Sequence, residues 1–295
     1  MRLLSYVAGG VARYGAVKGE GAVKADGVVD LTRRVGDRWP TLRAAIAAGA
    51  LPRLAEIVDA AAPDVALDGL TFAPTIPDPP KILCVGLNYK SHVGEMGREM
   101  PAQPSVFARL HDTLVAHGGD IVRPRVSTNL DFEGELAVVI GRHCRHVAEA
   151  DALSAIAGYT CFNDGSVRDF QKHSVTAGKN FPSTGALGPW MVTTDALPDP
   201  AALTLTTRLN GVEVQRAKTD QLIYPIPRIV AYLSTVTPLS PGDIIATGTP
   251  EGVGAGRKPP LWMKAGDAVE VEIAGIGTLR NAVRDERALP DAGLP

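Results

Sequence analysis

The stretch LDFEGELAVVIG, residues 130–141, joins a short acidic segment to a run of apolar residues. Residues 136–140 are mostly β-branched or aliphatic and a glycine follows them, which predicts a buried strand. Glu133 and Glu135 are two residues apart at its entrance, so the alternation of a strand places both carboxylates on one face. Burying two such carboxylates requires a compensating cation. The alternative is a solvated strand edge with two surface acids, which the spacing alone favours.

A third acid comes directly after the next apolar run, IAGYTCFN, residues 156–163. Asp164 precedes Gly165, a position where aspartate is often only a turn former. Together with Glu133 and Glu135 it would form an all-oxygen site, which suits Mg²⁺, Mn²⁺ or Ca²⁺ and not Zn²⁺. Asp131 shares the face of the two glutamates and stays open as a further ligand. Its position one step further from the buried run favours solvent exposure.

A histidine and a glutamate lie close together in VGLNYKSHVGEMG, residues 85–97. If this loop is helical, the spacing of three brings His92 and Glu95 together. Histidine is the side chain most easily poised as a base near neutral pH, and a carboxylate neighbour would fix its tautomer. The alternative is a surface histidine with a chance acidic neighbour.

Three further segments carry polar side chains suited to an anionic substrate. SVRDFQK contains Arg168 and Gln171, AGKNFPSTGALGP contains Lys179, and IIATGTPEGVG contains Thr249. Arginine can bind a carboxylate through two parallel hydrogen bonds, and lysine can neutralise a developing oxyanion. Each residue alone is more often a surface residue. The glycine-rich segment 248–256 has no GK[ST] and two prolines follow it, so a nucleotide site is excluded.

The rest of the chain predicts an α+β, β-rich fold with mixed sheets and few helices. Apolar runs bounded by Gly, Pro, Asn and Asp indicate strands in KILCVGLNY (81–89), ELAVVIG (135–141), IAGYTCFN (156–163), LTLTTRLNGVEV (203–214), DIIATGT (243–249) and AVEVEIAGIGTL (268–279). Asn210-Gly211 is a strong hairpin turn signal. Helices are expected at RIVAYLSTV (228–236), SVRDFQKHS (166–174) and EADALSAIA (149–157).

The first seventy or so residues predict short strands followed by an Ala-rich helix over residues 41–62. The segment TIPDPPK, residues 75–81, contains three prolines and is typical of a linker. We therefore expect a small N-terminal α/β domain over residues 1–75 and a catalytic domain over residues 76–295.

Composition narrows the classes of function. The 295 residues are 45% hydrophobic and 21% charged, and 30 basic residues are interspersed with 32 acidic ones, which speaks against nucleic acid as a partner. No signal peptide is apparent, and no apolar run approaches the roughly 20 residues that span a bilayer, so a cytoplasmic protein without membrane attachment is expected. Cys84, Cys144 and Cys161 are odd in number and widely spaced, and are expected to be reduced core thiols.

Taken together, these segments resemble the fumarylacetoacetate hydrolase superfamily, in its acylpyruvase and hydroxymuconate isomerase-like branch. The resemblance rests on ordered blocks: KILCVGLNYKSHVGE, LDFEGELAVVIGR, IAGYTCFNDGSVRDFQ, GKNFPSTGALGPWMVT, LNGVEVQ and PGDIIATGTPEGVG. It covers roughly residues 76 to 285, and the combination in this order is specific where a single block is not. The first seventy residues resemble, more loosely, the small N-terminal domain of many members.

The resemblance implies a β-sandwich-like roll, usually a homodimer, with one bound divalent ion. Its metal ligands would be the glutamates of the ExE motif and the aspartate of the ND motif, here Glu133, Glu135 and Asp164. Mg²⁺ or Mn²⁺ is the expected ion, and Ca²⁺ is a third candidate. The expected partner is a small anionic 2-oxo acid substrate.

The resemblance also implies roles for other residues. The His-Glu pair of the family's mobile lid and its lysine match the catalytic residues His92, Glu95 and Lys179. The positions where members contact substrate match Arg168, Gln171 and Thr249. One departure is visible, because Arg109 stands where many members have lysine; the charge is kept but the donor geometry differs. No role is assigned to Arg109 from the sequence.

The implied reaction is hydrolysis of a C–C bond in an acylpyruvate-like 2,4-dioxo acid, as in the catabolism of aromatic compounds. His92, oriented by Glu95, would activate water, and the electrons of the broken bond would pass into an enolate bound to the metal. The same chemistry supports isomerisation of hydroxymuconate-type dienes or decarboxylation of oxaloacetate-type acids, which we rank second. A non-catalytic metal-binding protein on the same fold is the alternative from another class.

Overall fold

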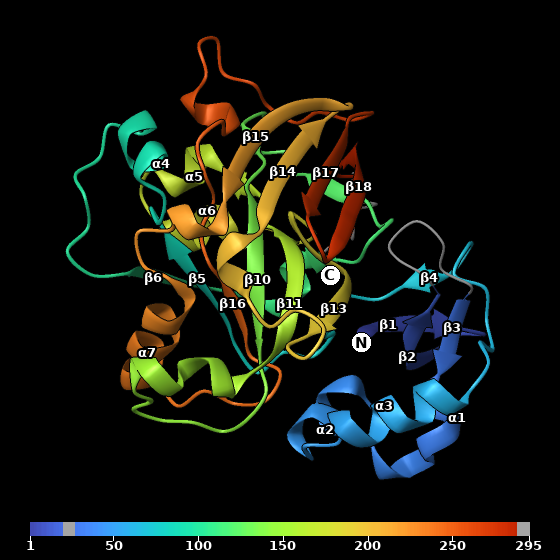
Figure 1. The fold of residues 1–295 in the computed structure, drawn as a ribbon. Helices are drawn as coiled ribbons and strands as arrows, with labels where there is room; N and C mark the ends of the chain where they lie inside the picture. Colours follow the sequence, from blue (N-terminus) through green and yellow to red (C-terminus); the bar gives the residue numbers. More distant parts are fainter. Residues whose placement is uncertain (20–26, 288–295) are drawn as a thin grey trace, which may run out of the picture.

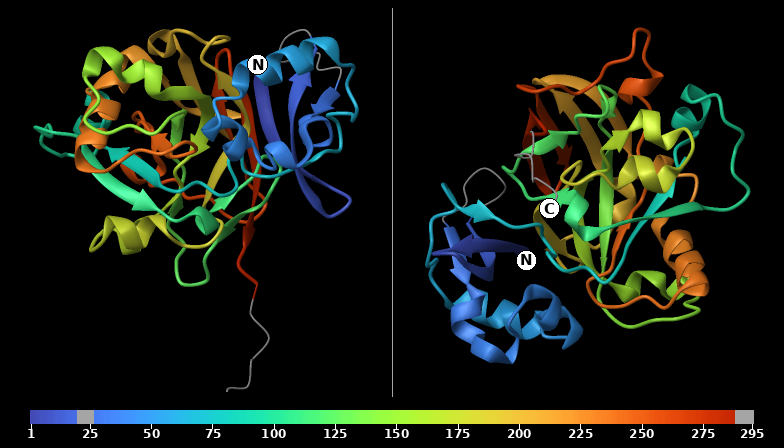
Figure 2. Two further views of the ribbon diagram at one scale, coloured as in Figure 1. Left: turned by 90° about the horizontal axis from the view of Figure 1, so that it is seen from below. Right: turned by 180° about the vertical axis from the view of Figure 1, so that it is seen from behind.

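A computed structural model describes residues 1–19 and 27–287 of the chain. It is an α+β fold rich in strands, as expected from the sequence. A smaller N-terminal lobe lies beside a larger body in all three views (Figures 1 and 2). None of the helices within residues 1–19 and 27–287 has both the length and the apolar character that a membrane span requires.

The largest sheet runs through both lobes. Its central path is β3 (Gly27–Asp30), β2 (Val11–Lys18), β1 (Arg2–Ala8), β13 (Gly185–Thr193), β11 (Ile156–Asn163), β10 (Gly134–Ile140), β16 (Ile244–Ala246), β5 (Ile82–Gly86) and β6 (Ser105–Arg109). Two short strands join it at the side, β4 (Thr71–Phe72) on β1 and β7 (Leu114–Val115) on β13. Because β1 pairs with β13, the sheet of the N-terminal lobe continues into the body. The domain boundary at residue 75 stays a prediction.

A second sheet packs against β10, β11 and β13 of the first and has the order β15 (Val212–Lys218), β14 (Thr204–Leu209), β17 (Ala268–Ile273), β18 (Gly277–Asp285) and β8 (Ile121–Arg123). The predicted hairpin between β14 and β15 is confirmed, with Asn210 at φ 54° and Gly211 at φ 79°. A small two-stranded sheet pairs β9 (Leu130–Asp131) with β12 (Ser166–Val167). This small sheet lies next to the acidic segment of the sequence.

The helices are short. In the N-terminal lobe α1 (Leu31–Val35), α2 (Leu42–Ala47) and α3 (Leu51–Ala60) pack beside β1 to β3 (Figure 1). The Ala-rich segment therefore forms two helices, because the chain turns at Gly49 with φ 64°. In the body α4 (Lys90–Glu95), α5 (Arg168–Gln171) and α6 (Val175–Lys179) gather at one end, and α7 (Ile226–Val236) lies at the other (Figure 1).

Two helix predictions were too long. Residues 149–155 form a 3₁₀ segment, and Ile156 already begins β11. Ser166 and Val167 are strand residues, so only the middle of SVRDFQKHS is helical. Further 3₁₀ turns occupy Gly36–Arg38, His111–Thr113, Pro200–Ala202, Thr219–Gln221 and Gly254–Gly256.

Strand β10 is buried on both faces and is the centre of the core. Leu136 and Val138 belong to one hydrophobic cluster, whereas Ala137 and Val139 belong to the other. The odd-numbered face carries Glu135, so the strand's alternation fixes the direction in which this carboxylate points. The three cysteines are buried and free, as predicted.

Candidate active site

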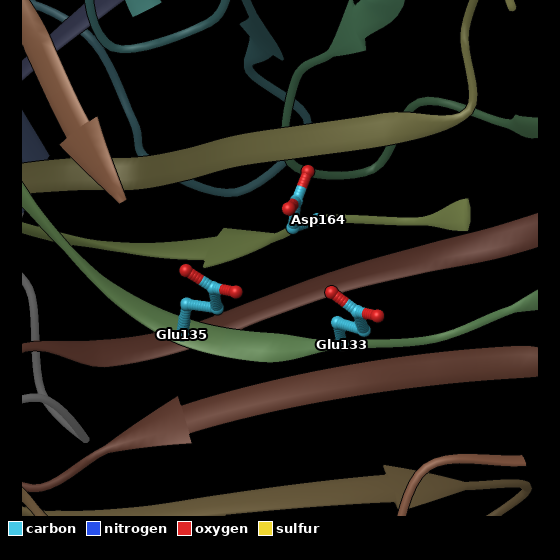
Figure 3. A group of neighbouring side chains, drawn as sticks. All are labelled: Glu133, Glu135 and Asp164. Carbon is cyan, nitrogen blue, oxygen red and sulfur yellow. The ribbon is translucent and has the colours of Figure 1, made fainter. Parts of the chain in front are cut away.

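The two glutamates and Asp164 meet at the end of neighbouring strands. Glu133 precedes β10, Glu135 lies within it, and Asp164 follows the adjacent β11. The antiparallel pairing of Gly134 with Asn163 aligns these ends, and the amide of Asp164 donates to the carbonyl of Glu133 at 2.8 Å. One carboxylate oxygen of each acid lies within 4.8 Å of those of the other two, and all three side chains are buried. Figure 3 shows both glutamates extending to the same side of one stretch of chain, toward Asp164.

Lys179, at the end of α6, provides the first cation for this cluster. Its Nζ lies 2.5 Å from Oε2 of Glu133 and 2.7 Å from Oδ2 of Asp164, and its side chain is 1% exposed. Burial alone would lower the pKa of Lys179, but the charges of Asp164 and Glu133 outweigh it and raise the pKa. Lys179 is therefore a fixed ammonium group between two of the acids.

Arg168, at the start of α5, provides the second cation. Its Nη2 lies 2.6 Å from Oε1 of Glu133 and 2.8 Å from Oδ2 of Asp131, and its Nη1 donates to Oε1 of Gln171 at 2.7 Å. Burial acts to raise the pKa of Glu133, but Lys179 and Arg168 outweigh it and lower that pKa to about 2. The predicted substrate residues Arg168 and Gln171 thus lie together, next to the predicted metal ligands.

Arg109 is a third cation, which the sequence analysis left without a role. It ends β6 with its side chain fully buried, and its Nη1 donates to Oδ1 of Asp164 at 2.6 Å and to the carbonyl of Gly165 at 2.9 Å. The rest of the guanidinium donates to the hydroxyls of Thr184 and Thr113 at 3.1 and 3.2 Å. The signal in the sequence was a cation in an otherwise strand-like run, SVFAR.

Glu135 differs from the other two acids because it makes no ion pair within the described residues. Its Oε2 accepts one hydrogen bond, from the amide of Gly248 at 2.7 Å. Burial, and then the charges of Asp164 and Glu133, raise the pKa of Glu135 well above its ordinary value. A buried carboxyl group without a cation, beside two others, fits a hard divalent ion, and the donor set is all oxygen. The residues present therefore fit Mg²⁺ or Mn²⁺.

His92 and Glu95 lie on one turn of α4, which we call the lid helix. The predicted pair is in contact, since Nδ1 of His92 lies 3.0 Å from Oε2 of Glu95. The other oxygen of Glu95 accepts from the amide of Gly252 at 2.9 Å. Because Nδ1 is held by the carboxylate, Nε2 is the ring nitrogen left to exchange a proton.

Asp131 is buried, and the expectation of a solvent-exposed acid is wrong. Its side chain is 0% exposed and accepts from the amides of Gly254 and Ala255 and from Arg168. It does not belong to the group of acids that could hold an ion in the described residues. Asp131 lies near Glu133, since Nη2 of Arg168 reaches both carboxylates, but the loop that covers Asp131 comes from a distant part of the sequence.

Thr249 is buried, with its hydroxyl already engaged. Its Oγ1 donates to the carbonyl of Gly134 at 3.0 Å and accepts from Nε2 of Gln215 at 2.9 Å. Gln215 also accepts from the amide of Gly134 at 3.0 Å and so fixes the backbone between the two glutamates. It was missed in the sequence analysis, where LNGVEVQ was interpreted only as a hairpin.

One cavity of about 580 Å³ brings these side chains together. Except for Glu95, all the predicted metal, catalytic and substrate residues line it: His92, Glu133, Glu135, Asp164, Arg168, Gln171, Lys179 and Thr249. Its other walls include Met96, Phe107, Val175 and Trp262. The cavity therefore has a charged end with the three acids and an apolar side suited to a short carbon chain.

A β-rich α+β fold in which His92 and a buried triad of acids line one cavity, with His92 held by Glu95, defines an enzyme with a candidate divalent metal centre. Residues 81–284 match the family model described as fumarylacetoacetate (FAA) hydrolase C-terminal. The chain belongs to this family, and the resemblance seen in the sequence is confirmed.

Related proteins carry several enzyme names. An oxaloacetate tautomerase, Fahd2a of Rattus norvegicus mitochondria, is 38% identical over 217 residues, which are 72% of this chain and 69% of the relative. The fumarylacetoacetate hydrolase structure from Exiguobacterium antarcticum is 32% identical with a TM-score of 0.80, covering 97% of this chain and 100% of that one. The maleylpyruvate hydrolase structure from Sphingobium sp. SYK-6, in complex with manganese(II) and pyruvate, is 29% identical with a TM-score of 0.80 at the same coverage. Enzymes of this family include hydrolases, isomerases and tautomerases, so the non-catalytic alternative is set aside.

Proposed function

We propose that the chain is a divalent-metal-dependent hydrolase that cleaves a C–C bond in a small 2,4-dioxo acid of the acylpyruvate type. The observation that carries the proposal is the shared cavity, which His92, held by Glu95, lines together with the triad of acids. Glu133, Glu135 and Asp164 would hold the ion. When bound there, it would supply a Lewis acid for the oxygens of a 2-oxo carboxylate. The maleylpyruvate hydrolase relative, with its bound manganese and pyruvate, supports this assignment.

Side chains of the cavity would bind the substrate, transfer the proton and stabilise the negative charge. Arg168 and Gln171 would bind the substrate carboxylate, while Nε2 of His92 would take a proton from water as the water adds to the distal carbonyl. The C–C bond would then break, and its electron pair would pass to the 2-oxo acid fragment as an enolate. Protonation of that carbon gives a 2-oxo acid, and the other fragment leaves as a carboxylic acid. The ammonium group of Lys179 would stabilise the negative charge.

A second candidate is tautomerisation, isomerisation or decarboxylation of a 2-oxo acid at the same site. The tautomerase relative at 38% identity favours this candidate. His92 would serve it by moving a proton between substrate atoms, which requires no water. We also propose a homodimer in the cytoplasm, as the resemblance and the sequence lead us to expect.

A substrate panel separates these reactions. Acetylpyruvate, oxaloacetate and a hydroxymuconate-type diene are each followed by ultraviolet absorbance with Mg²⁺ or Mn²⁺, and products are identified by chromatography. Hydrolysis predicts acetate and pyruvate from acetylpyruvate, and a rate that His92→Ala lowers at least about a hundredfold. His143→Ala, at an exposed histidine away from the cavity, is the control. Full hydrolytic rate in His92→Ala would show the water-activating role to be wrong, and tautomerisation without new carboxylic acid would favour the second candidate.

A further inference from the structure

Asp131 is a fully buried acid for which the proposed reaction provides no task. Four N–H groups converge on its two oxygens. Oδ1 accepts from the amides of Phe132 at 2.9 Å and Gly254 at 2.7 Å, and Oδ2 accepts from the amide of Ala255 at 3.0 Å and from Nε of Arg168 at 2.8 Å. We propose that Asp131 is a positioning residue that holds the guanidinium of Arg168 and the loop of residues 252–256 in one fixed arrangement. The inference rests on the proposed function for its kinetic consequences only.

The surroundings of Asp131 require a carboxylate. A carboxylate accepts at both oxygens and donates nothing, which matches four converging donors. An asparagine of the same shape would accept at one oxygen only and would turn its amide hydrogens toward two donors. Those donors would then be buried and unsatisfied. Asp131→Asn is therefore a severe change in hydrogen bonding and a small change in size.

On one side, Asp131 controls the direction of Arg168. The guanidinium is shared between Asp131 and Glu133, at 2.8 and 2.6 Å from Nη2, while Nη1 reaches Gln171. Without Asp131, the guanidinium would be free to turn onto Glu133 alone. The group that we expect to bind the substrate carboxylate would then lose its fixed position in the cavity.

On the other side, Asp131 fixes the loop that contacts the lid helix. Gly254 is held closely, since a Cβ there would lie 1.8 Å from the carbonyl oxygen of Leu261 and 2.6 Å from Oδ1 of Asp131. The same loop donates from the amide of Gly252 to Glu95, and a Cβ on Gly256 would lie 2.4 Å from Cδ of Glu95. Because Glu95 orients His92, one carboxylate supports both the substrate-binding cation and the catalytic base.

The alternative is that Asp131 merely stabilises a buried turn. Asp267 provides a matched control for that role, because it is also buried and accepts from the amide of Lys264 and from Asn210 away from the cavity. Asp267→Asn reports the general cost of replacing a buried aspartate by asparagine. A positioning role predicts effects in Asp131→Asn that Asp267→Asn does not share.

The first measurement does not depend on activity. Hydrogen exchange by mass spectrometry is compared for wild type, Asp131→Asn and Asp267→Asn, each loaded with Mn²⁺. We expect at least about tenfold faster exchange of the amides of residues 252–256 in Asp131→Asn only, because two of their hydrogen bonds end on this carboxylate. Unchanged exchange in that loop would overturn the proposal, even if no tested substrate is turned over.

The second measurement separates the two sides of Asp131. With a substrate that the wild type hydrolyses, Asp131→Asn is expected to lower kcat/KM by about 10- to 100-fold, through a higher KM and a lower kcat. In an Arg168→Gln background the effect of Asp131→Asn on KM should disappear, since its partner is gone, whereas the effect on kcat should remain. If Asp131→Asn raised KM by the same factor in the wild type and in the Arg168→Gln background, the proposal that Asp131 positions Arg168 would be overturned. Absence of turnover in the wild type with every substrate would refute the proposed function alone.

Discussion

At the scale of the residue, Arg109 is the clearest case of a side chain whose identity matters. Lysine, which many family members have in its place, presents three donors on a flexible stem, whereas arginine presents a planar fork. Here the fork bonds Asp164, the carbonyl of Gly165, and the hydroxyls of Thr113 and Thr184 at once. One ammonium group cannot reach all four.

Arg109→Lys is therefore expected to destabilise the metal-free protein by about 2 to 4 kcal/mol, the cost of two or three lost hydrogen bonds in a buried site. Urea denaturation followed by circular dichroism measures it. Arg142→Lys, at a surface arginine, is the control and should change stability by less than about 0.5 kcal/mol. Equal free energies of unfolding for the two variants would show that the guanidinium group of Arg109 has no structural importance.

The residues show what periodicity can predict. The two-residue spacing of Glu133 and Glu135 at a strand entrance correctly predicted that they share a face, and Asp164 was placed by the end of a neighbouring strand. The prediction that Asp131 is exposed to solvent was wrong because its partners at residues 254 and 255 are 123 and 124 positions away. Local alternation contains no information about a loop that folds back from so far, and the same limit hid Arg109 and Gln215.

At the scale of the element, the lid helix contacts the loop of residues 252–256. One glycine, Gly256, lies at this contact, and another, Gly94, lies in the lid helix away from it. A Cβ on Gly256 would lie 2.4 Å from Cδ of Glu95, whereas a Cβ on Gly94, within the lid helix, would meet nothing within 4 Å. The first position is close to the His92–Glu95 pair, and the second faces open space. An alanine at Gly256 therefore tests the contact with Glu95, and an alanine at Gly94 is its control.

Gly256→Ala should lower kcat by about tenfold or more, because the new methyl group displaces the flexible end of Glu95 and with it the orientation of His92. The melting temperature should change little, since a side chain moves and not the backbone. Gly94→Ala should keep kcat and stabilise the lid helix by about 0.5 to 1 kcal/mol. Steady-state kinetics and thermal unfolding of both variants check this; a normal kcat in Gly256→Ala would exclude the proposed role of the contact.

Element types were predicted better than element lengths. The strands around the site and the hairpin at Asn210-Gly211 follow from β-branched runs and turn residues. The single N-terminal helix was wrong because Gly49 lets the chain turn, and the segment at residues 149–157 was shortened because Ile156 pairs with Ile140 in the sheet. Tertiary pairing of this kind overrides local helix propensity.

At the scale of the whole molecule, several buried groups ionise only when the chain unfolds at high pH. Burial raises the pKa of Cys161 from 9.0 to about 12, and burial raises that of Tyr14 and Tyr159 from 10.0 to about 12. A raised pKa means that the folded state keeps a proton that the unfolded chain releases. The contribution to stability is complete below about pH 9 and is lost as pH rises toward 12.

The free energy of unfolding should therefore fall from pH 9 to 12 through Cys161 and from pH 10 to 12 through the two tyrosines, by about 1.4 kcal/mol per pH unit for each group. Urea denaturation at a series of pH values measures the slope. Tyr159→Phe removes one ionising hydroxyl and keeps the ring. Its free energy of unfolding should therefore fall less steeply above pH 10, by the contribution of one proton, about 1.4 kcal/mol per pH unit. A slope equal to that of the wild type would contradict the assignment of Tyr159.

The proposed chemistry depends on one divalent ion held by Glu133, Glu135 and Asp164. Calorimetric titration of Mn²⁺ into metal-stripped protein, for wild type, Glu135→Gln and the exposed control Glu251→Gln, tests this directly. We predict one site per chain in the wild type and in Glu251→Gln, and at least about a hundredfold weaker binding in Glu135→Gln, because a direct ligand should cost no less than a supporting residue does. No binding heat with Mn²⁺ or Mg²⁺ in the wild type, or equal affinity in Glu135→Gln, would contradict it.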